Sequence, residues 1–385
     1  MIPYGKQDIS PADIEAVVEV LKSDYLTQGA QVPRFEETIA DYCGAEFAVA
    51  VNSATSALHI ACLALGLGEG DILWTSPNTF VATANCARFC GAKVDFVDIN
   101  PDTYNLCEKA LEAKLKQAKR NHALPKIVVP VHFAGQACNM KQIHALSVQY
   151  GFKVIEDAAH AIGGKYLGQP IGGGKYSDIT VFSFHPVKIV TTGEGGVATT
   201  NQADLAEKMQ LLRSHGVTRQ PHLMTQPLEG GWFYQQVDLG FNYRMTEMQA
   251  ALGISQMQRL DAFIQQRTCF AGRYDTLLSD LPLVRPYQDP DTASSFHLYP
   301  ILIQTQQIQQ SRMEVFNALR THEIGVNVHY IPVHTQPYYQ ALGFAQGDFP
   351  LAEAYYQQTI SIPVFHAMCD AEQAQVVKVL QAVLA

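Results

Sequence analysis

The chain has 385 residues and a formal net charge of −9; 47% of its residues are hydrophobic and only 16% are charged. This length and composition predict a globular enzyme with a large core, and the negative charge, without any dense basic run, argues against nucleic-acid binding. The sequence contains no run of about 18 apolar residues, the length needed to span a membrane, and its N-terminus has no signal-peptide pattern. We therefore expect a cytoplasmic protein.

The first two-thirds of the chain alternates short apolar runs with helical segments. Strands are predicted at 47–51, 71–75, 93–97, 126–131, 153–155 and 178–182, and helices between several of them, such as 53–65 and 141–150. This alternation predicts an α/β fold with a mostly parallel sheet covered by helices. Ligands of such sheets bind at the carboxyl ends of the strands.

The pattern changes after about residue 255. A long helical stretch is predicted at 245–274, followed by a proline-containing segment, a strand at 297–303, a helix at 311–321 and a last helix from about residue 370. We therefore predict a large domain at 1–255, which includes an N-terminal substrate-site segment, and a smaller C-terminal α+β domain at 256–385.

The eight cysteines are scattered and show no CxxC pair or other ligand spacing. We therefore expect reduced thiols and no metal site. Cys86 and Cys90 could share one face of a helix, and we interpret them as two small core residues.

A carboxylate and a lysine each stand at the exit of a strand-like run. Asp157 ends an apolar run, and Lys188 lies between the next run and the glycine-rich stretch 193–196. This pair suits pyridoxal phosphate (PLP), because the amine forms a Schiff base with the aldehyde and the carboxylate keeps the pyridine nitrogen protonated. Most lysines are solvated charges, so the prediction depends on the combination. To act also as a base, Lys188 needs a pKa lowered by burial or by nearby positive charge.

Further residues would complete such a site. Ser53 is a plausible N-cap, so the N–H groups of Ala54 and Thr55 could hold a phosphate with help from the Ser183 hydroxyl; an ordinary capped helix is the alternative. Phe80 follows a strand and is either a core residue or a ring that stacks on the cofactor.

Two more positions leave alternatives open. His160 could bond the phenolic oxygen of the cofactor or Asp157, or could be structural. Asn242 precedes a helix that Thr246 would cap, and it could reach a phosphate.

Five motifs, in this order, carry a resemblance to a known family: Glu156-Asp-Ala-Ala-His-Ala, Phe182-Ser-Phe-His-Pro-Val-Lys188, Thr192-Gly-Glu-Gly-Gly196, Arg213-Ser-His-Gly-Val-Thr-Arg219 and Asn242-Tyr-Arg-Met-Thr-Glu-Met-Gln. Over nearly the whole chain the sequence resembles the DegT/StrS-type nucleotide-sugar aminotransferases, which are PLP enzymes of fold type I. It departs from the common pattern at His160 and Ile189.

The resemblance implies a role for each matching residue. Lys188 would carry the cofactor, Asp157 would pair with the pyridine nitrogen and Phe80 would stack on the ring. Ala54, Thr55 and Ser183 would bind the phosphate. Asn242 would reach the phosphate of the neighbouring subunit, which implies a homodimer with composite active sites.

Within the family, the segments 2–9, 21–29, 328–334 and 336–339 resemble one branch. Its enzymes form UDP-4-amino-4,6-dideoxy-N-acetyl-β-L-altrosamine for pseudaminic acid synthesis, by moving an amino group from L-glutamate to the C4 ketone of a UDP-4-keto-6-deoxy-N-acetylhexosamine. This implies that the sugar nucleotide is bound by Tyr4, Asp24, Tyr25, Leu26, Thr27, His329 and Tyr330.

Other functions are compatible with parts of the pattern. A related aminotransferase could act on another keto-sugar nucleotide, such as UDP-4-keto-arabinose. Sugar dehydratases of this kind replace the lysine with histidine, so Lys188 argues against them. A non-catalytic PLP-binding regulator would carry a basic DNA-binding module, which this sequence lacks.

Overall fold

The computed structural model describes residues 1–384. Its centre is a seven-stranded sheet in the order β1-β9-β8-β5-β4-β2-β3. The strands are β1 (Phe47–Val51), β2 (Ile72–Thr75), β3 (Lys93–Phe96), β4 (Ile127–Val129), β5 (Lys153–Asp157), β8 (Ile179–Ser183) and β9 (Gly196–Thr200). All pairings from β3 to β8 are parallel, and β9 runs antiparallel to both of its neighbours. The predicted, mostly parallel sheet is therefore confirmed.

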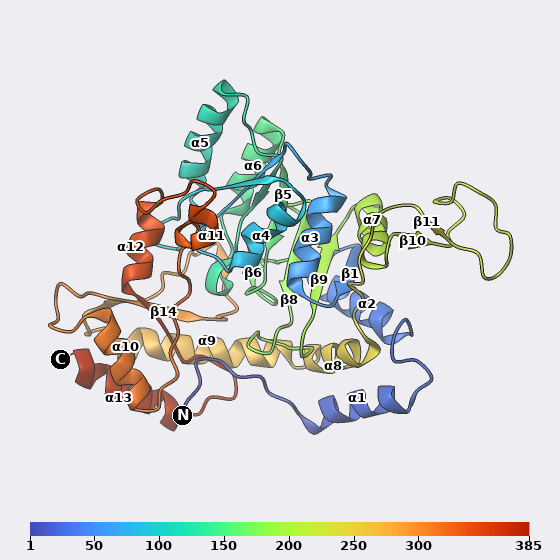
Figure 1. Ribbon diagram of the computed structural model, residues 1–385. Coiled ribbons are helices and arrows are strands. Elements are labelled where there is room, and N and C mark those ends of the chain that lie inside the picture. Colours follow the sequence, from blue (N-terminus) through green and yellow to red (C-terminus); the bar gives the residue numbers. More distant parts are fainter. Residues whose placement is uncertain (385) are drawn as a thin grey trace.

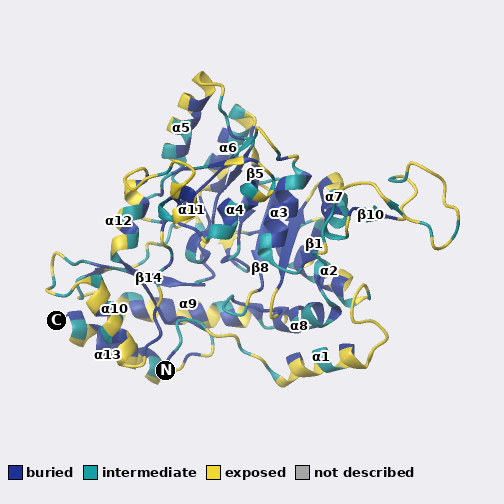
Figure 2. Cartoon of the chain, in the orientation of Figure 1, coloured by how far each residue is buried: buried dark blue, intermediate teal, exposed yellow. Residues whose placement is uncertain are grey.

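Helices cover both faces of this sheet (Figure 1). One layer contains α2 (Gln31–Cys43), α5 (Glu108–Arg120) and α6 (Met140–Tyr150), and the other contains α3 (Ala54–Ala64), α4 (Val81–Phe89) and α7 (Ala203–Arg213). Side chains of a strand alternate between the layers: Ala50 packs in the cluster of Phe35 from α2, whereas Val49 packs in the cluster of Leu58 from α3. This two-sided burial explains why most residues of the central strands are apolar (Figure 2).

The C-terminal part contains a second, antiparallel sheet. It consists of β12 (Leu283–Val284), β14 (Tyr299–Ile303) and β15 (Thr359–Ile362), and it packs with α10 (Arg312–Thr321), α13 (Asp370–Leu384) and the long helix α9 (Leu260–Leu277). Ile2 belongs to the same core and pairs with Ile324, so the N-terminus lies against this unit (Figure 1). The domain boundary at residue 255 stays a prediction.

One predicted helix is interrupted. The stretch predicted as one helix at 245–274 forms α8 (Glu247–Met257) and α9, with a break at 258–259. At the break the guanidinium of Arg259 contacts Asp8 at 3.1 Å and Asp13 at 2.5 Å. These contacts with the N-terminal segment accompany a turn that the helical periodicity does not show.

Of the remaining elements, α1 has 12 residues and the others are shorter. They are α1 (Pro11–Lys22), β6 (Lys165–Tyr166), β7 (Gln169–Pro170), β13 (Thr292–Ala293), α11 (Pro337–Gln340), α12 (Pro350–Gln358) and the 3-10 turns Phe133–Gly135 and Val333–Thr335. β10 (Val217–Thr218) and β11 (Gln235–Gln236) form the base of a long hairpin that projects from the molecule (Figure 1). Within residues 1–384, none of the helices combines the length and the apolar character that a membrane crossing requires.

Candidate active site

A cavity of about 1000 Å³ opens at the carboxyl ends of the parallel strands. β5 and β8 end there, and α3 and α4 begin there, as expected for a ligand site on such a sheet. Ten residues predicted from the sequence line this cavity: Tyr4, Ala54, Thr55, Phe80, Asp157, His160, Ser183, Lys188, His329 and Tyr330.

Lys188 lies in a turn that follows β8, where its backbone N–H donates to the carbonyl of His185 at 2.9 Å. Burial of the ammonium lowers the pKa of Lys188 to about 8, although the negative charge of Asp157 raises it in part. About a tenth of the amine is therefore neutral at pH 7, against less than about a thousandth for a lysine of ordinary pKa. This is the property that a Schiff-base lysine and a proton carrier need.

Asp157 is buried and held by two donors. Thr83 donates its hydroxyl proton to Oδ2 at 2.7 Å, and the N–H of Ala159 donates to Oδ1 at 3.1 Å. Because Thr83 gives its proton to the carboxylate, the Thr79 hydroxyl, 2.7 Å away, must be the donor to Thr83. A carboxylate can accept about four hydrogen bonds, so Asp157 can still accept one from a donor in the cavity.

The first turn of α3 provides an anion site. Ser53 is the N-cap, as predicted, and its Oγ accepts the N–H of Ser56 at 3.1 Å. The N–H groups of Ala54 and Thr55 lie between the Ser53 cap and Ser56, at the positive end of the helix dipole. Gly196 passes directly beneath them, since a Cβ at this position would lie 2.5 Å from the Ala54 nitrogen.

His160 is buried and bonded on both ring nitrogens. Its Nδ1 accepts the N–H of Ala134 at 3.3 Å, so in the neutral ring Nε2 carries the proton and donates to the Tyr330 hydroxyl at 3.0 Å. Burial and then the nearby charge of Lys188 hold the pKa of His160 well below its usual range. His160 thus bonds Tyr330 rather than Asp157, and it leaves the proton of the Tyr330 hydroxyl free to be donated elsewhere.

His329 is also neutral. Burial, with a contribution from Lys188, lowers the pKa of His329 to about 3. Its Nε2 lies 3.4 Å from the amide nitrogen of Asn327, and its Nδ1 lies 2.9 Å from the Ser361 hydroxyl. The Tyr4 ring contacts the His329 ring with centroids 5.4 Å apart. Tyr4 and His329 therefore form an uncharged, aromatic wall of the cavity.

Phe80 is 59% exposed although it lines the cavity. An uncovered aromatic face beside Lys188, Asp157 and the α3 N-terminus is available to stack on a planar ligand. An amine of lowered pKa, a buried carboxylate with spare acceptor capacity and free N–H groups together fit PLP.

Several lining residues were not identified from the sequence: Thr79, Thr83, Glu194, Gln249, His297 and Asn327. Glu194 lies in the glycine-rich motif that follows Lys188, and this location in the sequence could have identified it as a lining residue of the cavity. The ring of His297 lies 4.4 Å from that of His160, and burial holds the pKa of His297 well below its usual range. No sequence motif marks His297.

Five predicted residues do not line this cavity in the single chain. Asn242 is exposed, and its carbonyl lies 3.5 Å from the side-chain amide of Asn52 at the cavity edge. The segment 24–27 is exposed as well, and the carbonyl of Leu26 accepts the N–H of Glu247 at 3.1 Å. Contacts of these five residues with cofactor or substrate stay predictions.

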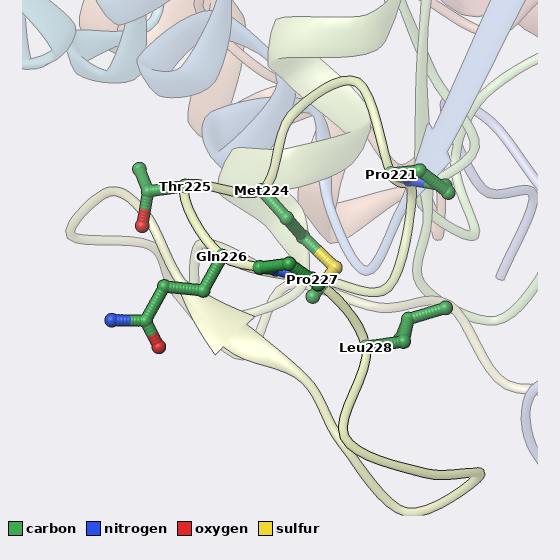
Figure 3. Close-up of a pocket in the computed structure, with 6 residues that line it drawn as sticks. All are labelled: Pro221, Met224, Thr225, Gln226, Pro227 and Leu228. Atoms are coloured by element: carbon green, nitrogen blue, oxygen red, sulfur yellow. The ribbon is translucent and has the colours of Figure 1, made fainter.

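A second hollow lies within the projecting hairpin (Figure 3). It measures about 280 Å³ and is lined by Pro221, Met224, Thr225, Gln226, Pro227 and Leu228. This lining offers no acid, base or strong nucleophile, so the cavity around Lys188 is the better candidate for chemistry.

Comparison with known proteins agrees with this geometry. The profile of the DegT/DnrJ/EryC1/StrS aminotransferase family matches residues 7–381. The spore coat polysaccharide biosynthesis protein SpsC of Bacillus subtilis is 39% identical over 383 residues, which cover 99% of this chain and 96% of that protein. The UDP-4-amino-4,6-dideoxy-N-acetyl-β-L-altrosamine transaminase of Campylobacter jejuni is also 39% identical, over 98% of this chain and 96% of that enzyme.

A solved structure has the same fold. Helicobacter pylori PseC, an aminotransferase involved in pseudoaminic acid biosynthesis, superposes with a TM-score of 0.90 at 30% identity and covers 100% of this chain and 99% of its own. The predicted fold class, PLP-dependent fold type I, is thereby confirmed. The chain belongs to the DegT/DnrJ/EryC1/StrS aminotransferase family and is a PLP-dependent sugar aminotransferase.

Proposed function

We propose that this enzyme moves an amino group from L-glutamate to the C4 ketone of a UDP-4-keto-6-deoxy-N-acetylhexosamine, giving UDP-4-amino-4,6-dideoxy-N-acetyl-β-L-altrosamine. The observation that carries this proposal is the similarity, over almost its whole length, to the Campylobacter jejuni enzyme named for that product. The cavity of about 1000 Å³ lies at the upper end of the roughly 300–1,000 Å³ usual for small-molecule sites, which suits a site that holds both a cofactor and a sugar nucleotide.

The residues of the cavity have distinct proposed roles. Bound PLP supplies an aldehyde that condenses with amines and a ring that withdraws electrons. Lys188 Nζ, with its pKa of about 8, holds and moves the proton at Cα of glutamate and at C4 of the sugar. Asp157, oriented by Thr83, presents a carboxylate to the ring nitrogen. Tyr330 donates its hydroxyl proton into the cavity.

A second keto-sugar nucleotide, such as UDP-4-keto-arabinose, is the alternative substrate. We retain this alternative because SpsC, which is not named for that product, is as similar to this chain as the transaminase is. A few side chains in the sugar pocket set such specificity, so overall identity does not distinguish the two.

The test is a substrate panel. Purified enzyme with PLP and L-glutamate is incubated with UDP- and dTDP-linked keto-sugars, and each product is identified by NMR. The proposal expects amination at C4 of the N-acetylated UDP-4-keto-6-deoxy sugar. If only a keto-pentose is aminated, the substrate proposed here is wrong and the aminotransferase activity stands.

The two half-reactions separate sugar binding from cofactor chemistry. Because His329 and Tyr330 are proposed to contact the sugar nucleotide, His329→Ala and Tyr330→Ala should slow the reaction of the keto-sugar with the aminated enzyme. Both should spare the release of 2-oxoglutarate from glutamate. Tyr287→Ala, which truncates an exposed tyrosine outside the cavity, is the control. Equal loss of both half-reactions would assign these residues to the cofactor site or the fold.

We also propose that the enzyme is a homodimer with composite sites. Asn242 is exposed near the cavity edge, where a partner's cofactor phosphate would meet it. The projecting hairpin region leaves Trp232 73% and Leu239 75% exposed, and large uncovered apolar side chains of this kind favour a protein contact.

A further inference from the structure

The ring of His160 is held in one orientation by contacts on several sides. It is buried, and its Nδ1 accepts the backbone N–H of Ala134 at 3.3 Å. The Ser295 hydroxyl donates to the backbone carbonyl of His160 at 2.9 Å, and the His297 ring packs against the His160 ring with centroids 4.4 Å apart. These contacts fix both the position of the ring and its neutral tautomer, in which Nε2 carries the proton.

Tyr330 is positioned by a separate set of contacts. Its backbone N–H donates to the side-chain oxygen of Asn78 at 3.3 Å, and the buried Asn78 side chain in turn donates to the carbonyl of Tyr104 at 3.2 Å. The Phe133 ring packs against the Tyr330 ring in a T-shaped arrangement, with centroids 6.2 Å apart. Together, the two sets of contacts bring the Tyr330 hydroxyl to 3.0 Å from Nε2 of His160.

This arrangement determines where the phenolic proton of Tyr330 is directed. Because Nε2 of His160 is the donor, the Tyr330 oxygen accepts and its own proton faces away from His160. Within residues 1–384 the hydroxyl has no other hydrogen-bond partner, and Tyr330 lines the cavity. Burial, with contributions from Asp157 and Tyr4, raises the pKa of Tyr330 above its ordinary value, so the hydroxyl keeps this proton. The proton is therefore available to an oxygen of a ligand in the cavity.

The position of Tyr330 in the cavity favours an oxygen of the sugar as this acceptor. The groups that suit the cofactor come from the central sheet and the helices that cover it. Tyr330 comes instead from the segment 327–330, which pairs with β15 of the C-terminal sheet. Its ring lies beside the exposed ring of Phe80, with centroids 6.3 Å apart. The hydroxyl is thus carried by the opposite wall of the cavity, next to the aromatic face that is available to a planar ligand.

We propose that His160 is a positioning residue for the keto-sugar half of the reaction: its Nε2–H directs the Tyr330 proton to the carbonyl oxygen at C4 of the sugar. This inference rests on the proposed function, since it assigns two residues to that same substrate. A hydrogen bond to this oxygen draws electrons from the carbonyl carbon, which then reacts more readily with an amine. His160 acts only through Tyr330, so the loss of its ring N–H should slow this half-reaction and leave the cofactor unaffected.

The first test compares the two half-reactions of the PLP-loaded enzyme, each followed by the visible absorbance of the cofactor and expressed per loaded site. His160→Leu should slow the reaction of the aminated enzyme with the keto-sugar about three- to tenfold, the loss expected for one hydrogen bond, and should change the glutamate half-reaction by less than about twofold. His160→Gln, whose amide can both accept from Ala134 and donate to Tyr330, should recover most of the rate. Equal slowing of both half-reactions, or no slowing of either, overturns the proposal.

The second test asks whether His160 acts through Tyr330. If it does, the double variant His160→Leu/Tyr330→Phe should react with the keto-sugar no more slowly than Tyr330→Phe alone, because the effects of coupled residues do not add. A double variant that is slower by the product of the two single effects would show that His160 acts separately.

The spectrum of the PLP-loaded enzyme distinguishes the sugar from the cofactor as the acceptor. The pH midpoint of the visible absorbance should be the same in the wild type, His160→Leu and Tyr330→Phe. A shift of about one pH unit in either variant would place the hydroxyl on the phenolic oxygen of the cofactor and overturn the proposal. A wild type that does not react with the N-acetylated keto-sugar overturns the proposed substrate and this inference together. Normal wild-type turnover with unaffected variants overturns only the role of His160.

Discussion

At the scale of single residues, the cavity contains one amine that titrates near neutral pH, that of Lys188, beside the neutral imidazole rings of His160 and His329. Burial lowers the pKa of Lys188 to about 8, and it holds the pKa values of His160 and His329 far below their usual range. The histidines therefore stay uncharged near neutral pH, and Lys188 is the group whose proton exchanges most readily there.

This gives a pH prediction for covalent capture of PLP by the cofactor-free enzyme. Only the neutral amine attacks the aldehyde, and a lowered pKa makes the neutral form available at lower pH. The capture rate, followed by visible absorbance, should rise with pH and be half-maximal near pH 8, whereas an unperturbed lysine would give a midpoint of about 10.4. Lys188→Ala should show no covalent capture at any pH. A midpoint above pH 10 in the wild type would contradict burial as the cause.

A second prediction concerns Thr83, which we propose as a positioning residue for Asp157. Thr83→Val removes the donor to Oδ2 while it keeps the volume, so the carboxylate retains only the N–H of Ala159. A hydrogen bond to a charged group contributes about 1.5–3 kcal/mol, so we expect kcat to fall about tenfold or more. Asp157→Asn should cost about 10²–10³ in rate.

The control for this prediction is Thr83→Ser, which keeps the hydroxyl and should recover most of the activity. A merely structural role would lower Tm and leave kcat per folded enzyme unchanged. If Thr83→Val has wild-type kcat and wild-type affinity for PLP, the hydroxyl does not position Asp157.

The place of Lys188 and Asp157 in one cavity was predictable, because Asp157 ends an apolar strand, Lys188 follows another, and the carboxyl ends of parallel strands meet at one edge of a sheet. Thr83 was not, because its hydrogen bond joins α4 to a carboxylate 74 positions away. The bond from His160 to Tyr330 spans 170 positions. A sequence shows which residue types are present but not which of them pair over such separations.

At the scale of elements, the anion site depends on how β9 passes under α3. A methyl group on Gly196 would lie 2.5 Å from the backbone of Ser53 and Ala54, so the first turn of α3 must shift. Gly196→Ala should therefore weaken PLP affinity by at least about tenfold and lower Tm. Titration of cofactor-free protein with PLP and a thermal melt measure the two effects.

Gly272→Ala is the matched control for this substitution. Gly272 lies on α9, is exposed, and a Cβ there would meet no atom within 4 Å. The change should leave PLP affinity unaltered and stabilise the protein by about 0.4–1 kcal/mol, because alanine restricts the unfolded chain and favours the helix. Equal PLP affinity in both variants would show that Gly196 does not shape the anion site.

The elements themselves followed largely from periodicity and capping. The Ser53 cap and the strand at 47–51 appear where the sequence predicts them, and the strand predicted at 153–155 continues to Asp157. The break between α8 and α9 does not, because Arg259 there reaches Asp13, which lies 246 positions away in the chain. Long-range contacts of this kind override local helical preference.

At the scale of the whole molecule, the order of the strands in the sheet could not be predicted from the sequence pattern. β1 pairs with β9 rather than with β2, so the first strand lies beside a segment about 150 positions later in the chain. β9 runs antiparallel to both of its neighbours. This pairing places Gly196 beneath α3. The single chain also leaves Asn242 and the hairpin uncovered, which is why we place the completion of the site in a dimer.

Subunit exchange tests that composite site. Lys188→Ala and Asn242→Asp are each expected to be inactive, the second because it sets a carboxylate against phosphate. If Asn242 serves the partner's cofactor, a heterodimer of the two variants contains one site with both lesions and one with neither, so it should recover about half of wild-type activity. Lys188→Ala mixed with Asp157→Asn is the matched control, because both residues line the cavity of their own chain and neither site would be intact. No recovery in the first mixture, despite exchange verified by mass spectrometry, would mean that each subunit binds its cofactor phosphate alone.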